Sequence, residues 1–108
     1  MNGKNAVTLI GYVGRDLKST THDGLSRVAL RMATHHFVKN KAGESINQTT
    51  WHNVVAWEQA ADFANRNFVK GSKIMVEGAI VYETYTGKDG KKKFGAHIKA
   101  ISLTNLDR

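Results

Sequence analysis

Five segments of the chain alternate between apolar and polar residues with the period of two that is typical of β-strands. They span residues 5–13, 26–34, 49–57, 73–86 and 92–103. Successive side chains on a strand point to opposite sides, so the alternation gives each strand a face toward a core and a face toward solvent. The chain is therefore predicted to be mainly β.

The first predicted strand is apolar on both faces. Val7 and Leu9 point to one side, whereas Ile10 and Tyr12 point to the other. Because a strand with one solvated face alternates cleanly, we expect this one to lie deep in a barrel or against a second subunit.

Glycines indicate where the strands bend and turn. Gly11 and Gly14 interrupt the first strand, as expected where a barrel strand bends sharply or bulges. The sequence at 22–25 predicts a hairpin turn, and polar, glycine-containing segments at 39–44 and 86–91 predict the tips of two longer hairpins.

The period changes between residues 58 and 69, where small and apolar residues such as Ala61, Ala64 and Phe68 recur at helical spacing. Gly71 is predicted to follow this helix as its C′ residue. The order is thus three strands, one helix and two strands. A β-sandwich does not need the helix, and a ferredoxin-like fold needs two.

This order predicts an all-β fold with one helix, namely a five-stranded OB-fold barrel with the helix between strands 3 and 4 and with long β-hairpins. The length of 108 residues is enough for one domain, which we assign to residues 1–108. Cysteine is absent, and no segment is long and apolar enough to span a membrane or to act as a signal peptide. We expect a cytoplasmic protein with no membrane partner.

Catalytic and metal-binding patterns are missing from the sequence. His35 and His36 are adjacent, so on a strand they point to opposite faces and cannot share a metal ion. His22, His52 and His97 fall in separate strands with no carboxylate pattern beside them. There is no phosphate-binding loop and no nucleophile elbow. We therefore predict no enzyme activity, no metal and no cofactor.

The net charge of +7 favours a polyanionic partner. Five aromatic residues stand beside basic segments, and we predict that such rings stack on bases: Phe37, Trp51, Trp57, Tyr82 and Tyr85. The lysines predicted to contact phosphates are Lys39, Lys41, Lys70, Lys73, Lys88, Lys91 and Lys92. The alternative is that both tryptophans are core residues. Against it, Val54 and Ala56 occupy the opposite strand face and are able to fill the barrel.

Three segments resemble bacterial single-stranded DNA-binding proteins. Residues 5–16 resemble their opening strand, residues 50–57 their third strand, and residues 69–78 the end of their helix and their fourth strand. The resemblance implies an OB-fold that assembles as a homotetramer and holds single-stranded DNA during replication, recombination and repair, at the bacterial nucleoid. It places the family's stacking positions on four of these five aromatics, Phe37, Trp51, Trp57 and Tyr85, and gives His52 a subunit-interface position.

The sequence departs from that family in three ways. Asn53 stands where arginine is common, and Phe37 and Tyr85 stand where tryptophan is common, which implies weaker contacts. The family's acidic, partner-recruiting tail is also missing from residues 1–108, so recruitment of replication enzymes through it is not expected. Two alternatives stay open: a dimeric, tail-less primosomal accessory protein that acts through protein contacts, and an RNA-binding protein.

Overall fold

The computed structural model describes residues 3–15 and 17–107. Its elements are β1 (Val7–Val13), β2 (Lys18–His22), β3 (Leu25–Lys39), β4 (Ser45–Trp57), α1 (Gln59–Asn67), β5 (Lys73–Thr86) and β6 (Lys92–Asn105). β2 was not predicted, because the first predicted strand ends at Val13, as β1 does. With β1 and β2 counted as one strand, the barrel has five strands.

The strands form one sheet in the order β1-β5-β6-β4-β3-β2, and a further pairing between β1 and β3 closes it into a barrel. Neighbours are antiparallel except β4 and β6, which pair in parallel through Val54 and Val55 opposite Ile98 and Lys99. The predicted five-stranded OB barrel is confirmed. Its helix lies between β4 and β5, which are the third and fourth strands when β1 and β2 are counted as one.

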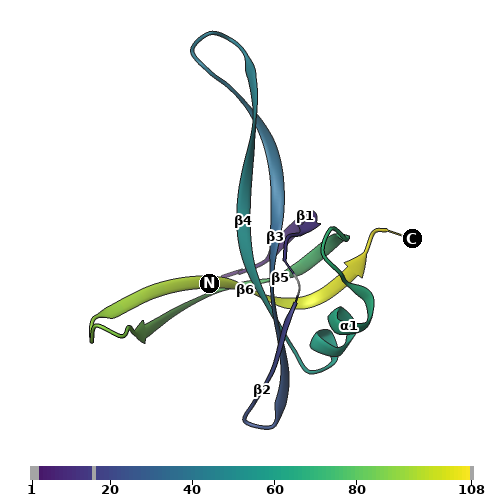
Figure 1. The fold of residues 1–108 in the computed structure, drawn as a ribbon, viewed down its shortest axis with the longest axis vertical. Coiled ribbons are helices and arrows are strands. Elements are labelled where there is room, and N and C mark those ends of the chain that lie inside the picture. Colours follow the sequence, from purple (N-terminus) through teal and green to yellow (C-terminus); the bar gives the residue numbers. More distant parts are fainter. Residues whose placement is uncertain (1–2, 16, 108) are drawn as a thin grey trace.

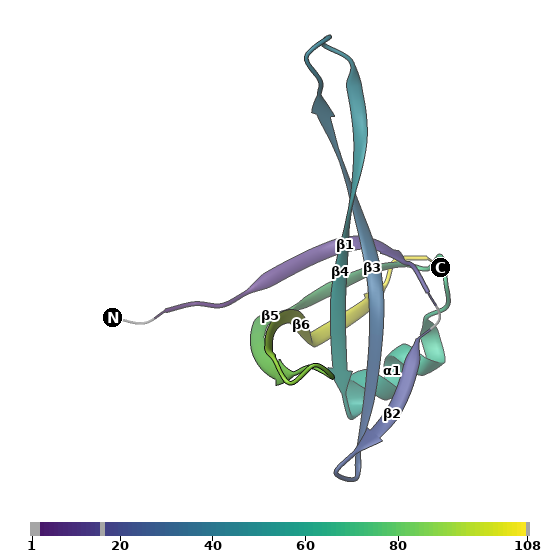
Figure 2. The ribbon, with the colours of Figure 1, turned by 60° about the vertical axis from the view of Figure 1, so that its left-hand side comes forward.

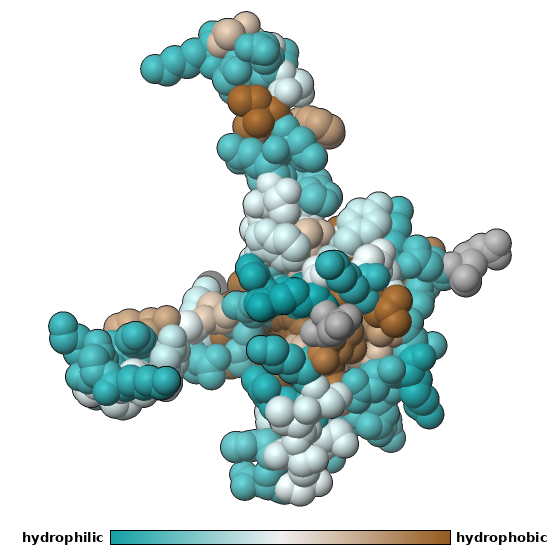
Figure 3. Space-filling view, in the orientation of Figure 1, coloured by the Kyte–Doolittle hydropathy of each residue, from teal (hydrophilic) through white to brown (hydrophobic). Residues whose placement is uncertain are grey.

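Two hairpins leave the barrel as long arms (Figure 1). The first arm is the outer part of β3 and β4, whose pairing continues to Lys39 opposite Ser45. The second is the outer part of β5 and β6, paired as far as Thr86 opposite Lys92. The arms raise the radius of gyration to 16.0 Å, whereas a compact chain of this length has about 13 Å. The space-filling view shows both as projections from the body (Figure 3).

The core lies where the inner faces of the strands meet inside the barrel. β3 contributes Val28 and Met32, β4 contributes Val54, and β5 contributes Ile74 and Val76, each with an exposed fraction of 1% or less. Full burial of such a side chain contributes about 1.5–3 kcal/mol. The residues of β3 and β4 lie on the faces that the alternation predicted to be internal, whereas no inner face was predicted for β5.

The helix α1 covers one end of the barrel, against β3, β4 and β6 (Figure 2). Its small side chains Ala61 and Ala64 are fully buried, and Phe68 closes the core directly after it. The helix is shorter than predicted, because Phe68 is already extended. Gly71 therefore is not the C′ residue; it lies in the following turn with φ +90°, a conformation that favours glycine.

Two glycines allow backbones to approach inside the barrel wall. A Cβ on Gly11 would overlap the carbonyl oxygen of Ala33 on β3, and a Cβ on Gly78 would overlap that of Lys99 on β6. Gly78 also marks the β-bulge where the register between β5 and β6 shifts. The close approach lets β5 bend from the barrel into its arm, as bulges do in curved sheets.

Replacing Gly78 by alanine is therefore expected to destabilise the protein by about 2 kcal/mol, because the added methyl group must displace the backbone of β6. Thermal or urea unfolding measures this change. Gly3→Ala is the matched control, because a Cβ at Gly3 meets no atom within 4 Å, and its effect is expected to stay within about 0.5 kcal/mol. Equal stability of the two variants would contradict the close approach.

Candidate nucleic-acid interface

The pairing of β3 with β4 assembles an outer face that carries both tryptophans. Partners in an antiparallel pair point to the same side of the sheet. Trp57 lies opposite Arg27, Asn53 opposite Arg31, and Trp51 opposite Ala33. The alternation that sends Val54 inward therefore sends the tryptophans and the two arginines outward together.

Trp51 lies outside the core, with 48% of its surface exposed. The guanidinium carbon of Arg31 lies over its ring, 5.0 Å from the ring centroid. The absence of a side chain at Gly14 leaves room for the ring, because a Cβ there would overlap it. The ring is thus held from two sides while part of it stays open to solvent.

Trp57 is half-buried at the other end of the same face. The guanidinium carbon of Arg27 lies 5.7 Å from its ring centroid, and the ring of His22 meets it edge-on at 6.0 Å. Each tryptophan is therefore paired with one arginine, a favourable cation–π arrangement. Neither tryptophan fills the barrel, so the alternative prediction of two core tryptophans is wrong.

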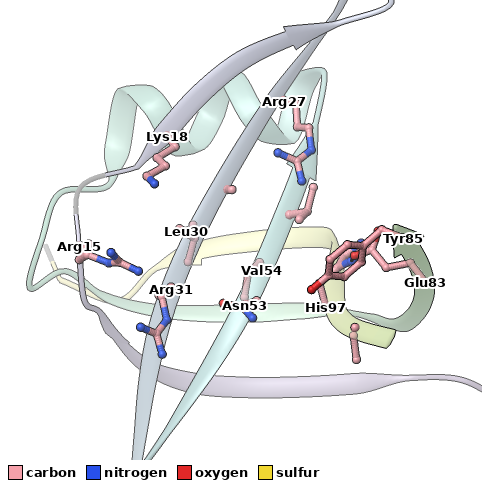
Figure 4. Close-up of a pocket in the computed structure, with 14 residues that line it drawn as sticks. Arg15, Lys18, Arg27, Leu30, Arg31, Asn53, Val54, Glu83, Tyr85 and His97 are labelled. Atoms are coloured by element: carbon pink, nitrogen blue, oxygen red, sulfur yellow. The ribbon is translucent and has the colours of Figure 1, made fainter. Parts of the chain in front are cut away.

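A groove runs across this face to the β5–β6 arm (Figure 4). Arg27 and Arg31 project into it from β3, and Tyr85 borders it from β5. Tyr85 is 54% exposed, and its ring lies next to Gly95, where a Cβ would be in ordinary van der Waals contact with it. The groove thus joins an exposed ring on the arm to the basic residues of β3.

Sequence reasoning missed the basic residues that line the groove most directly. These are Arg15, Lys18, Arg27 and Arg31. The sequence did indicate Arg27 and Arg31, because both occupy outward positions in the alternation with the buried Val28, Leu30 and Met32. Lys18 lies opposite Ala29 across the β2–β3 pair, and that pairing could not be inferred from alternation in so polar a segment.

The predicted stacking residue Phe37 lies on the β3–β4 arm, 73% exposed and opposite Asn47. It occupies the same strand face as Trp51, but it is well beyond the groove. Lys39 and Lys41 lie further out still, at the end and the tip of that arm. This arm therefore extends the face that carries the tryptophans.

The other predicted lysines fall into two groups. Lys88, Lys91 and Lys92 lie at or beside the tip of the β5–β6 arm, beyond Tyr85. Lys70 and Lys73 lie in the turn after α1 and at the start of β5, next to the end of β1. Neither group lines the groove itself.

His52 is partly buried at the edge of the core, opposite Met32. Its Nε2 is 2.9 Å from the hydroxyl oxygen of Thr34, so it has a hydrogen-bond partner within the chain. Burial lowers the pKa of this histidine from its ordinary value, because the charged form is poorly solvated there. His52 also lines a second groove, together with Trp51, Ile80, Tyr82 and Ile98.

Two histidines do have carboxylate partners, so the prediction that no carboxylate stands beside them is wrong for both. His97 is paired with Glu83, with 3.0 Å between Nδ1 and Oε1, and His22 is paired with Asp23, with 3.6 Å between Nε2 and Oδ2. The cross-strand register of the arm, Glu83 opposite Gly95 and Val81 opposite His97, makes the pair of His97 with Glu83 diagonal. In the described part of the chain no three histidine or acidic side chains are grouped to hold a metal ion.

The family model described as the single-strand binding protein family matches residues 4–106. The chain belongs to this family. Within residues 3–15 and 17–107, no helix is long and apolar enough to cross a membrane.

Relatives with established names are proteins called single-stranded DNA-binding protein. The one from Xanthomonas campestris is 34% identical over 105 residues, covering 96% of this chain and 61% of its own length. That from Chlorobaculum tepidum is 34% identical over 106 residues, covering 96% and 65%. The chain thus spans about three fifths of the length of these relatives.

Two solved structures are similar along nearly the whole chain. A Plasmodium falciparum single-stranded DNA-binding protein, solved in complex with single-stranded DNA, gives a TM-score of 0.87 at 25% identity and covers 99% of this chain and 100% of its own. A deletion mutant of the Thermus aquaticus single-stranded DNA-binding protein gives 0.83 at 26% identity and covers 97% and 51%.

The partial burial of His52 predicts a pH dependence of stability. The unfolded chain binds a proton at this residue near pH 6.5, whereas the folded chain binds it only at lower pH. Its contribution to stability is therefore expected to be lost as the pH falls below about 6.5. Urea unfolding at a series of pH values measures this.

His52→Gln, which keeps a hydrogen-bonding group near Thr34, is the comparison. It is expected to flatten the fall in stability between about pH 7 and 5. Identical pH profiles for the two proteins would count against a partly buried, neutral His52. His36→Gln, on the exposed arm, serves as the control.

Proposed function

We propose that this protein binds single-stranded DNA with little sequence preference, by stacking bases on aromatic rings and pairing phosphates with basic side chains. The observation that carries the proposal is the outer face of β3 and β4, where the half-exposed Trp51 is held beside Arg31. A groove connects the arginines of that face to Tyr85. Rings and cations are thus interleaved along one surface.

Stacking on Phe37, Trp51, Trp57 and Tyr85 accounts for tolerance of sequence. Every base has a π face, and stacking on an aromatic ring contributes about 1–3 kcal/mol per base. In a duplex these faces are covered by neighbouring bases, so a surface that recognises them selects unpaired strands. The cation–π contacts with Arg27 and Arg31 orient the two tryptophans before any base arrives.

Phosphate contacts provide the remaining affinity. Arg15, Lys18, Arg27 and Arg31 line the groove, and their charges attract the sugar–phosphate backbone there. Along the arms, the proposal retains Lys39 and Lys41 beside Phe37, and Lys88, Lys91 and Lys92 beyond Tyr85. Lys70 and Lys73 are retained as contacts for a strand that leaves the groove near the end of β1.

The proposed role is to cover and protect exposed strands during replication, recombination and repair in the bacterial cytoplasm, at the nucleoid, without catalysing a reaction. The names of the relatives and the DNA complex of the Plasmodium falciparum protein support the binding partner. They favour this role over that of a primosomal accessory protein that acts through protein contacts.

The proposal includes assembly as a homo-oligomer, with a tetramer expected. The outer face of β1 exposes Ile10 and Tyr12, at 53% and 43% of their surface. Exposed apolar residues next to one another mark interaction surfaces. The partly buried His52 is retained as a subunit-interface position.

Tryptophan fluorescence tests the binding proposal directly. Titration with oligo-dT is expected to quench the emission, because stacking places bases against Trp51, and Trp51→Ala is expected to weaken binding by about 1–3 kcal/mol. An RNA oligomer of matched length tests the preference for DNA, and solution mass with and without DNA tests the tetramer. Absence of quenching at low salt would overturn the stacking proposal.

Salt dependence tests the basic groove. The logarithm of the affinity is expected to fall linearly with the logarithm of salt concentration, by about 0.7 for each phosphate neutralised on a single strand. Arg31→Met is expected to weaken binding and to lower this slope by about 0.7. Arg66→Met is the matched control, because it removes the same charge from the exposed end of α1. Equal slopes for the two variants would contradict the role of Arg31.

A further inference from the structure

The β5–β6 arm carries aromatic residues on both of its faces. Tyr85 points to the groove side, with Gly95 beneath its ring. Residues two apart on a strand share a face, and their cross-strand partners join them. Tyr82 opposite Ala96, and Phe94 opposite Thr84, therefore share the other face of the arm. We call this second surface, formed by Tyr82 and Phe94, the distal face.

The distal face is more exposed than the groove face. Tyr82 and Phe94 expose 78% and 81% of their surface, compared with 54% for Tyr85. Neither residue contributes to the core, so the fold provides no reason for aromatic side chains at these two positions. Large exposed apolar side chains that stand close together mark a binding surface.

The electrostatics of the arm indicate what binds there. The tip, residues 87–93, contains four lysines and one aspartate. Lys92 lies on the distal face, since its partner Thr86 belongs to the same alternating series as Tyr82 and Thr84. A second copy of the chain would bring two lysine-rich tips together, which like-charge repulsion opposes. A polyanion with flat, stackable groups complements both the charge and the rings.

We propose that the distal face is a second stacking site for single-stranded DNA, so that a long strand contacts the β5–β6 arm on both sides. A strand bound in the groove reaches Tyr85, passes the lysine-rich tip, and returns along Phe94 and Tyr82. The inference rests on the proposed function and adds to it a binding site outside the groove. It makes the arm an element that DNA encircles rather than one edge of a groove.

Oligomers of different length distinguish binding in the groove from binding at the distal face. A short oligo-dT of about 8 nucleotides fills the groove, whereas one of about 35 nucleotides also reaches the distal face. The variant Tyr82→Thr/Phe94→Thr removes both rings while keeping residues that favour strands. At a salt concentration where binding is measurable, it is expected to lower the affinity for the long oligomer about 10-fold or more. The affinity for the short one is expected to stay within about twofold.

Controls keep the outcomes distinct. Thr84→Ala, on the same face but without a ring, is expected to bind both lengths as the unaltered protein does. Unchanged affinity of the double variant for the long oligomer would overturn the second site and leave the groove proposal intact. A change in solution mass of the double variant without DNA would overturn it in favour of a subunit contact. Failure of the unaltered protein to bind either length would overturn both proposals.

A fluorescent residue on the distal face gives a direct readout. In the variant Trp51→Phe/Trp57→Phe/Phe94→Trp, the only tryptophan lies on that face. Its emission is expected to be quenched by the long oligomer, whose binding is followed independently by the anisotropy of a label on the DNA. DNA binding without quenching would overturn the distal site even if the affinities agreed.

Discussion

The register between β3 and β4 is the constraint on which the other features of this molecule depend. Val28, Leu30 and Met32 face inward opposite Ala56, Val54 and His52, and this pairing builds most of one barrel wall. A slip of one residue would send every side chain on a strand to the other face. Burial of Val54 and Ala56 therefore also fixes Trp51 and Trp57 on the outside. The same pairing of β3 with β4 therefore fixes both the core and the proposed interface, on opposite faces of the two strands.

The outer face is organised before any ligand is present. Arg31 and Arg27 lie over the two tryptophans, and Gly14 leaves space for Trp51. Side chains already held in place lose less conformational entropy when a ligand binds. Since the guanidinium groups also supply positive charge in the groove, the same contacts that orient the rings place cations near the expected path of the phosphates.

Alternation was sufficient to predict the parts of the chain that touch the core. The inward positions of β3 and β4 and the order of strands and helix follow from it, and so does the outward position of Trp51. The strands of the β3–β4 arm extend further than predicted because exposed residues such as His36 and Gln48 pair through their backbones, which leaves little apolar pattern in the sequence. The helix ends early because Phe68 must turn into the core.

The parts that were not predicted depend on contacts between strands distant in sequence. The pair of His97 with Glu83 requires the register of β5 with β6, and the basic lining of Arg15 and Lys18 requires the bend between β1 and β2. Neither is encoded locally. The aromatic positions were easier to predict, because rings beside lysines stand out in the sequence even before their neighbours are known.

The two arms also bear on how the molecule moves. Their outer strands have almost no buried side chains, so little beyond one ladder of hydrogen bonds holds each arm in shape. Segments of this kind open locally at a small fraction of the global unfolding free energy, and their amide protons exchange with solvent early. Bending of an arm to follow a flexible polymer therefore leaves the barrel undisturbed. The adaptable arms and the rigid barrel are thus separate regions of the molecule.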